Sequence, residues 1–142
     1  MKKEVRLYIG GTFDLLHSGH IALFKRCKEL GYVIVSLNRD EFVTRYKREP
    51  ILTFEHRKEL LESCKYIDEV ITNTGDEDSK ISILSSKATH IVHGSDWSGD
   101  ALMKQMGFDQ KWLDINNIEM LYLSYTAGIS TTDIINKIKN IK

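Results

Sequence analysis

Five short runs of apolar and β-branched residues constrain the fold of this chain more than any other feature. The runs occupy residues 5–10, 32–37, 67–72, 89–94 and 119–124, and segments of helical periodicity lie between them. Short strands that alternate with helices are typical of βαβ units and a parallel sheet. The alternation therefore predicts an α/β fold, a Rossmann-like doubly wound five-stranded parallel sheet with helices on both faces.

The helical segments are predicted from the spacing of their apolar residues. They are 18–30, 53–65 and 131–141, and 98–118 is expected to form a helical insertion. Gly31 is expected to end the first helix. Thr53 is expected to cap the second, and Ser130 or Thr131 the third.

Length and charge restrict the organisation and the partners. The 142 residues suit one domain, 1–142, and 20 basic residues balance 20 acidic ones. A neutral chain is not drawn to nucleic acid or to a membrane surface, and it has no apolar run of the roughly 20 residues that a membrane span requires. Cys27 and Cys64 lie in helical patterns. With no signal peptide evident, they are expected to be reduced, in a cytoplasmic protein.

The turn after the first strand carries the least ordinary residues. Gly10 and Gly11 end the strand, and His17 and His20 follow near the start of a helix. Glycines let a ligand approach the backbone, and a helix start offers unpaired N–H groups to an anion. The pattern favours a phosphate site. Two alternatives remain on spacing alone: the histidines only cap and pack, or they bind zinc, for which i, i+4 spacing is more usual.

A second helix start has the same character. Ser130 and Thr131 provide hydroxyl groups there, and Gly128 precedes them. In doubly wound sheets, ligands bind beyond the carboxyl ends of the strands, near the point where the strand order reverses. We therefore expect the two helix starts to face each other and bind one phosphate-rich ligand.

The two motifs together resemble a known family. The stretch GTFDLLHSGH at 11–20 is similar to the HxGH signature of the nucleotidyltransferase superfamily, and GISTTDI at 128–134 to its second signature. With TFEHRKELLESCKYIDEVI at 53–71 between them, nearly the whole chain resembles the cytidylyltransferase branch. The likeness is greatest to the short bacterial glycerol-3-phosphate cytidylyltransferases.

The resemblance implies a set of site residues. The catalytic residues would be His17, His20, Lys47, Arg48, Ser130 and Thr131. The nucleotide would contact Gly10, Gly11, Thr12, Phe13, His17, Gly19, His20, Arg48, Asp96, Tyr125, Thr126, Ala127, Gly128, Ile129, Ser130 and Thr131. The acceptor would contact Asp14, Lys47, Arg57, Lys80 and Trp97. No metal ligand is expected from the protein.

The resemblance also implies a reaction. CMP would pass from CTP to a phosphorylated small alcohol, with glycerol 3-phosphate giving CDP-glycerol, a precursor of cell-surface polymers, and pyrophosphate. Mg²⁺ would bind mainly through the CTP phosphates. The partners would be CTP and the acceptor, in a homodimer.

Several alternatives stay open at this point. Tyr125 stands where glycerol-3-phosphate enzymes commonly have an arginine. The acceptor could instead be 2-aminoethylphosphonate, phosphocholine, phosphoethanolamine or another polyol phosphate. An adenylyltransferase acting on a sugar phosphate and a non-catalytic nucleotide sensor are the remaining readings.

Overall fold

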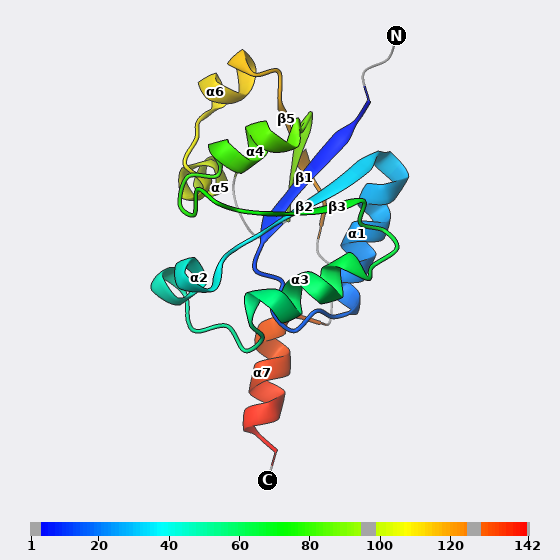
Figure 1. Cartoon of the computed structure of the whole chain (residues 1–142), viewed down its shortest axis with the longest axis vertical. Coiled ribbons are helices and arrows are strands. Elements are labelled where there is room, and N and C mark those ends of the chain that lie inside the picture. The colour runs from blue at the N-terminus through cyan, green and yellow to red at the C-terminus, as the bar shows by residue number, and fades with distance from the viewer. Residues whose placement is uncertain (1–3, 95–98, 125–128, 142) are drawn as a thin grey trace.

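A parallel sheet forms the centre of the molecule (Figure 1). The computed structural model describes residues 4–94, 99–124 and 129–141. Among these the five strands are β1 (Arg6–Gly11), β2 (Tyr32–Leu37), β3 (Glu69–Thr72), β4 (His90–His93) and β5 (Glu119–Tyr122). They lie in the order β3-β2-β1-β4-β5, and every pairing is parallel. The predicted Rossmann-like five-stranded sheet is confirmed.

The helices connect these strands. They are α1 (Ser18–Leu30), α2 (Asp40–Tyr46), α3 (Phe54–Glu62), α4 (Lys80–Ser86), α5 (Gly99–Met106), α6 (Gln110–Ile115) and α7 (Thr131–Lys139). The helical insertion predicted at 98–118 is confirmed in kind, as two short helices. The sequence did not predict α2 and α4, because each has only seven residues, too few for a clear periodicity.

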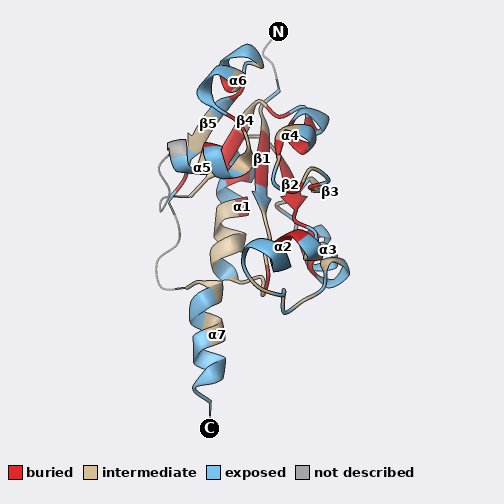
Figure 2. Ribbon diagram, turned by 90° about the vertical axis from the view of Figure 1, so that its left-hand side faces the viewer, coloured by how far each residue is buried: buried red, intermediate tan, exposed pale blue. Residues whose placement is uncertain are grey.

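Two apolar clusters pack against the two faces of the sheet. On one face, Phe24 and Cys27 of α1 and Leu61 of α3 pack against Leu7 and Val33 of the strands. On the other face, the buried side chains come from α4, α5 and α6, and they include Ile83, Met103 and Leu113. Buried residues concentrate in the strands between these helical layers (Figure 2). The prediction of helices on both faces is therefore confirmed.

The capping predictions can be checked residue by residue. Thr53 caps α3 by accepting a hydrogen bond from the His56 N–H, and Ser130 caps α7 by accepting one from Asp133. Gly31 follows the last residue of α1, as expected. Cys27 is buried, Cys64 is partly buried, and both are free thiols.

Helix α7 differs from the other helices in its environment. It extends away from the sheet at one end of the molecule (Figures 1 and 2), and none of its described residues is buried. Its isoleucines at 134, 135 and 138 form a stripe, but Ile138 is 55% exposed. The start of α7, in contrast, is held against the body of the protein.

The strand order places the ligand-binding region. It reverses direction at β1, which lies between β2 and β4. The chain leaves β1 toward α1, on one face, and leaves β4 toward α5, on the other. A crevice opens at the carboxyl ends of strands where connections diverge in this way.

Candidate active site

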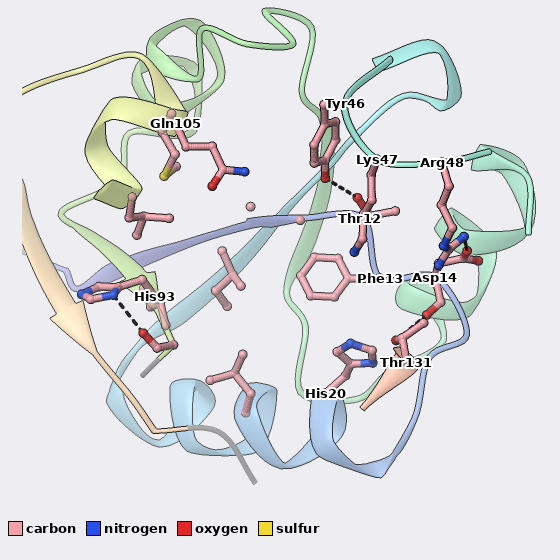
Figure 3. A pocket seen from close by; sticks show the side chains of 18 residues that line it. Thr12, Phe13, Asp14, His20, Tyr46, Lys47, Arg48, His93, Gln105 and Thr131 are labelled. Carbon is pink, nitrogen blue, oxygen red and sulfur yellow. Dashed lines mark hydrogen bonds and ion pairs between the residues drawn. The ribbon is translucent and has the colours of Figure 1, made fainter. Parts of the chain in front are cut away.

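A cavity of about 300 Å³ lies at the carboxyl ends of β1 and β4. Its wall is made by Ile9, Gly10, Gly11, Thr12, Phe13, Asp14, His20, Leu23, Tyr46, Lys47, Arg48, Val92, His93, Gly94, Leu102, Gln105, Met106 and Thr131 (Figure 3). Nine of the residues predicted for the site line this main cavity: Gly10, Gly11, Thr12, Phe13, Asp14, His20, Lys47, Arg48 and Thr131. They come from segments up to 121 positions apart in the chain.

His17 and His20 form a reciprocal cap at the start of α1. His17 is the N-cap residue, and its Nδ1 accepts a hydrogen bond from the Gly19 N–H at 3.1 Å. His20 is the third residue of the helix, and its Nδ1 accepts from the His17 N–H, also at 3.1 Å. This is the capping-box arrangement with imidazoles in place of the usual side chains.

The reciprocal cap fixes the protonation of both rings. A ring nitrogen that accepts a hydrogen bond carries no proton, so the proton of each neutral imidazole lies on Nε2. Burial lowers the pKa of His17, and burial together with the neighbouring His17 lowers the pKa of His20 to about 4. The rings stack with their centroids 3.8 Å apart. At neutral pH the structure therefore provides two neutral Nε2–H donors, and His20 lines the cavity.

The start of α7 lies beside this pair. A side chain at Gly19 would meet the His17 ring at 2.9 Å and Ile129 Cγ2 at 3.1 Å, so it would require one of these side chains between the two helix starts to shift. The Thr131 hydroxyl donates to the Asp14 carbonyl oxygen at 3.0 Å. The expectation that the two helix starts face a shared cavity is therefore met.

The two hydroxyl groups at the start of α7 differ in whether their proton is free to donate a hydrogen bond to a ligand. Thr131 already uses its proton on Asp14. Ser130 Oγ accepts from the Asp133 N–H at 3.1 Å, so its own proton remains available. The first N–H groups of a helix also lack partners within the helix. An anion at this position would therefore meet the Ser130 hydroxyl and backbone N–H groups, rather than the Thr131 proton.

The loop between β1 and α1 is held in an unusual backbone conformation. Phe13 and Leu15 have φ angles of 51° and 54°, in the left-handed region that bulky residues rarely adopt. Asp14, between them, is buried, and its carboxylate accepts from the backbone N–H groups of Ile51 and Leu52 and from Arg48 Nη1 at 2.9 Å. Strain of this kind persists only where the surroundings enforce it.

The carboxylate of Asp14 therefore has a structural role: it holds the loop at Ile51 and Leu52 and the Arg48 side chain in place. Burial by itself would raise the pKa of Asp14, but the hydrogen bonds from Ile51, Leu52 and Arg48 outweigh burial and lower that pKa. Arg48 also donates to the Glu49 carbonyl oxygen.

Lys47 forms no ion pair with any described residue, and in Figure 3 its side chain extends into the cavity.

Arg57, predicted to contact the acceptor, lies elsewhere. Its side chain is 0% exposed, and it does not line the cavity. The guanidinium donates to the carbonyl oxygens of Leu52, Thr12 and Asn38 and to the carboxylate of Asp40. The arginine thus ties α3 to the loops after β1 and β2. The sequence contained a signal that Arg57 lies on the buried face of α3, since it lies one helical turn before the apolar Leu61.

Lys80 also lies outside the cavity. Its Nζ donates to the Gly107 carbonyl oxygen at 2.6 Å and pairs with Asp78, beside an open surface pocket near Trp112. Asp96, Trp97, Tyr125, Thr126, Ala127 and Gly128 lie outside the described residues.

Other cavity residues were not anticipated from the sequence. Tyr46, the last residue of α2, donates to or accepts from the Thr12 hydroxyl at 3.1 Å, and Gln105 of α5 lies on the cavity wall. Asn38 and Asn73 follow β2 and β3 directly, line a second, smaller cavity beside the main one, and hydrogen-bond to each other at 3.0 Å. Their position after strand ends was the usable signal, because these ends meet at one edge of the sheet.

The described residues do not form a metal site of their own. None of them belongs to a group of three or more histidine, cysteine, aspartate or glutamate side chains placed to hold an ion. Nor is any helix among them both long and apolar enough to cross a bilayer.

Comparisons with known proteins agree with this geometry. The model of the cytidylyltransferase-like family matches residues 8–137. The glycerol-3-phosphate cytidylyltransferase of Bacillus subtilis (strain 168) is 40% identical over 98% of this chain and 99% of its own length, and that of Staphylococcus aureus (strain NCTC 8325 / PS 47) is 38% identical over 91% of both. An FAD synthase of Pyrococcus horikoshii is 33% identical over 98% of this chain and 95% of its own length.

A solved structure supports the fold. The lipopolysaccharide core biosynthesis protein from Thermoplasma volcanium GSS1 superposes with a TM-score of 0.69, covering 89% of this chain and all of that one, at 22% identity. The family match extends from the first strand to the last helix, over the same cavity that the two helix starts enclose. The chain therefore belongs to the cytidylyltransferase-like family of nucleotidyltransferases.

Proposed function

We propose that this protein transfers CMP from CTP to glycerol 3-phosphate, releasing pyrophosphate and forming CDP-glycerol. The observation that carries the proposal is the shared cavity, in which His20, Lys47 and the start of α7 surround one space. The identity of 38–40% to glycerol-3-phosphate cytidylyltransferases over more than nine-tenths of the chain supports the choice of nucleotide and acceptor.

The reaction is a displacement at the α-phosphorus of CTP. An oxygen of the acceptor phosphate attacks, the bond to the bridging oxygen breaks, and pyrophosphate leaves with its electron pair. The attacking phosphate is already ionised, so no general base is needed. Catalysis then consists of positioning and of stabilising the charge on the phosphoryl oxygens.

The side chains suit these tasks. The Nε2–H groups of the histidine pair would donate to phosphoryl oxygens without first losing or gaining a proton, because the reciprocal cap holds them neutral. Lys47, which no described carboxylate neutralises, would bind the charge of the leaving pyrophosphate or of the acceptor phosphate. The backbone N–H groups at the start of α7 would bind a further phosphate.

Mg²⁺ would be held mainly by the triphosphate. The described carboxylate on the main cavity wall, Asp14, is already bonded to Arg48 and to two backbone N–H groups. This donor set fits an ion that keeps most of its ligands from phosphate and water. Bound there, Mg²⁺ would neutralise charge on the triphosphate.

Two further features belong to the proposal. The free thiols Cys27 and Cys64 agree with a reducing, cytoplasmic location. A homodimer is proposed from the family resemblance.

The proposal is tested by incubating the purified chain with CTP, glycerol 3-phosphate and Mg²⁺, and measuring CDP-glycerol by mass and pyrophosphate release by a coupled assay. We expect both products in equal amounts, and much lower turnover when ATP replaces CTP. ATP turnover equal to that of CTP would contradict the cytidylyl assignment and favour the alternative of an adenylyltransferase.

A further inference from the structure

A second, smaller cavity adjoins the main one. It has a volume of about 120 Å³ and lies beyond the carboxyl ends of β1, β2 and β3. It shares Gly10, Gly11, Tyr46, Leu102, Gln105 and Met106 with the main cavity, so the two are lobes of one space. We call it the side lobe. In Figure 3, Tyr46 and Gln105 extend from α2 and α5 into the space that both lobes share.

The two lobes differ in charge. The main cavity is lined by Lys47, which pairs with no described carboxylate, by Arg48, which pairs with Asp14, and by the neutral donor His20. Among the described residues that line the side lobe, Asp76 is the one with an ionisable charge at neutral pH, and the others are amide, hydroxyl, aromatic and aliphatic side chains. Phosphate groups therefore belong in the main cavity. The larger volume suits the nucleotide, and the smaller one suits a short uncharged group.

The carboxylate of Asp76 is already neutralised. Arg39 donates to it with two nitrogens, Nε to Oδ1 at 3.0 Å and Nη2 to Oδ2, and Arg45 Nη2 lies 3.5 Å from Oδ2. Arg45 also pairs with Glu77 at 2.7 Å. The hydrogen bonds from Arg39 lower the pKa of Asp76. The cluster of Arg39, Arg45, Asp76 and Glu77 thus has two positive and two negative charges.

The backbone around Asp76 holds the carboxylate in place. Asp76 has a φ of 51°, a left-handed conformation that aspartate and asparagine tolerate better than other side chains. Its carbonyl oxygen accepts from Asn73 Nδ2 at 3.0 Å, and the residue is 9% exposed. The carboxylate is therefore fixed at the wall of the side lobe, facing its guanidinium partners.

From these contacts we infer that the side lobe binds the uncharged hydroxylated tail of the acceptor, and that the Arg39–Asp76–Arg45 cluster rejects acceptors whose tail carries an ammonium group. An ammonium would need a free carboxylate, since burying an unpaired charge is costly. Both lining carboxylates among the described residues, Asp14 and Asp76, are committed to arginines. A glycerol tail needs hydroxyl and amide partners, which Tyr46 and Gln105 supply.

The inference rests on the proposed function and extends it from a reaction to a rule for acceptor choice. It assigns a role to Arg39 and Asp76, neither of which was expected to belong to the site. An ethanolamine-phosphate cytidylyltransferase of Dictyostelium discoideum, 28% identical over 96% of this chain and 37% of its own length, is a relative whose name gives an ammonium-bearing acceptor. In this chain, the neutralised side lobe would favour acceptors with an uncharged hydroxylated tail over acceptors with an ammonium tail.

The test compares kcat/KM for three acceptors: glycerol 3-phosphate, phosphoethanolamine and 3-phosphoglycerate, whose tails are neutral, cationic and anionic. The wild-type protein is expected to prefer glycerol 3-phosphate. Arg39→Gln combined with Arg45→Gln frees Asp76, and should shift the ratio toward phosphoethanolamine on the order of tenfold, as expected for one charged hydrogen bond. Arg45→Gln alone leaves the two bonds from Arg39 and serves as the matched control, with little shift.

A variant that removes the carboxylate instead of the arginines provides an independent test if the double variant fails to fold. Asp76→Asn keeps the tolerated backbone conformation and frees Arg39, so it should raise the relative turnover of 3-phosphoglycerate by a similar factor. Unchanged acceptor ratios in both folded variants would overturn the inference, as would a change in the KM for CTP without any change in acceptor preference. If the wild-type protein turns over no acceptor with CTP, the proposed function fails and the inference falls with it.

Discussion

At the scale of single residues, His20 has two separable roles. Its Nδ1 caps α1 by accepting from the His17 N–H, and its ring lines the cavity with the proton on Nε2. The first role is structural and can be taken over by glutamine, the usual residue at the third position of a capping box. The second requires the imidazole.

Substitution of His20 should separate these roles. His20→Gln is expected to keep the free energy of unfolding within about 0.5 kcal/mol of wild type, because the side-chain amide oxygen of glutamine can replace Nδ1 as the acceptor for the His17 N–H. His20→Ala should lose about 1 kcal/mol as a lost cap. Both should lower turnover by roughly 10²–10³-fold, through loss of a phosphate donor. Urea unfolding and the pyrophosphate assay measure the two effects. Near-native turnover in either variant would remove His20 from the mechanism.

At the scale of elements, Arg57 connects α3 to the loops that form the cavity. Its guanidinium holds the carbonyl oxygens of Thr12 and Asn38, after β1 and β2, and pairs with Asp40 at the start of α2. Two connections at the strand ends, after β1 and after β2, therefore depend on one side chain. The left-handed conformations of Phe13 and Leu15 lie in the loop that Arg57 anchors.

Loss of the planar Arg57 guanidinium should therefore lower the stability of the folded protein. Arg57→Lys keeps the charge but cannot reach four acceptors, and should destabilise the protein by about 2 kcal/mol, as expected when a buried guanidinium loses hydrogen bonds and leaves carbonyl oxygens unpaired. Glu59→Ala, on the exposed side of the same helix, is the control and should change stability by less than about 0.5 kcal/mol. Thermal unfolding measures both. A stable Arg57→Lys protein with a raised KM for the acceptor would instead support direct acceptor contact.

At the scale of the whole molecule, the buried neutral histidine makes folding depend on pH. The pKa of His20 is about 4 in the folded protein and near 6.5 in the unfolded chain. Below about pH 6.5 the unfolded chain binds a proton that the folded protein does not. The contribution of His20 to stability is therefore present above that pH and is lost as the pH falls toward about 4.

The comparison with His20→Gln isolates this contribution, because other groups titrate equally in both proteins. We expect the unfolding free energy of wild type to fall more steeply than that of His20→Gln between about pH 6.5 and about pH 4. Urea unfolding across this range measures it. Parallel curves would show that His20 takes up its proton over the same pH range in the folded and unfolded protein, contrary to the lowered pKa of the buried ring.

The sequence by itself determined the features that depend on neighbouring positions in the chain. The alternation of strands and helices predicted the sheet, and the glycines, histidines and hydroxyls predicted the two helix starts and the phosphate-binding character of the cavity. Helix caps at Thr53 and Ser130 were also local signals, since a cap bonds to residues within one turn. Short helices such as α2 escaped prediction because seven residues show too little periodicity.

The tertiary structure alone decided which charged groups are free to act. Arg57 and Asp14 have the residue types of a substrate site, but partners 5 to 45 positions away occupy the guanidinium, and partners 34 to 38 positions away occupy the carboxylate. Arg39 and Asp76 meet across 37 positions in the same way. Pairing through space depends on how strands and loops pack, and no local pattern encodes it. For this reason the sequence predicted a phosphate site between the two helix starts, while the charge of the side lobe followed only from the fold.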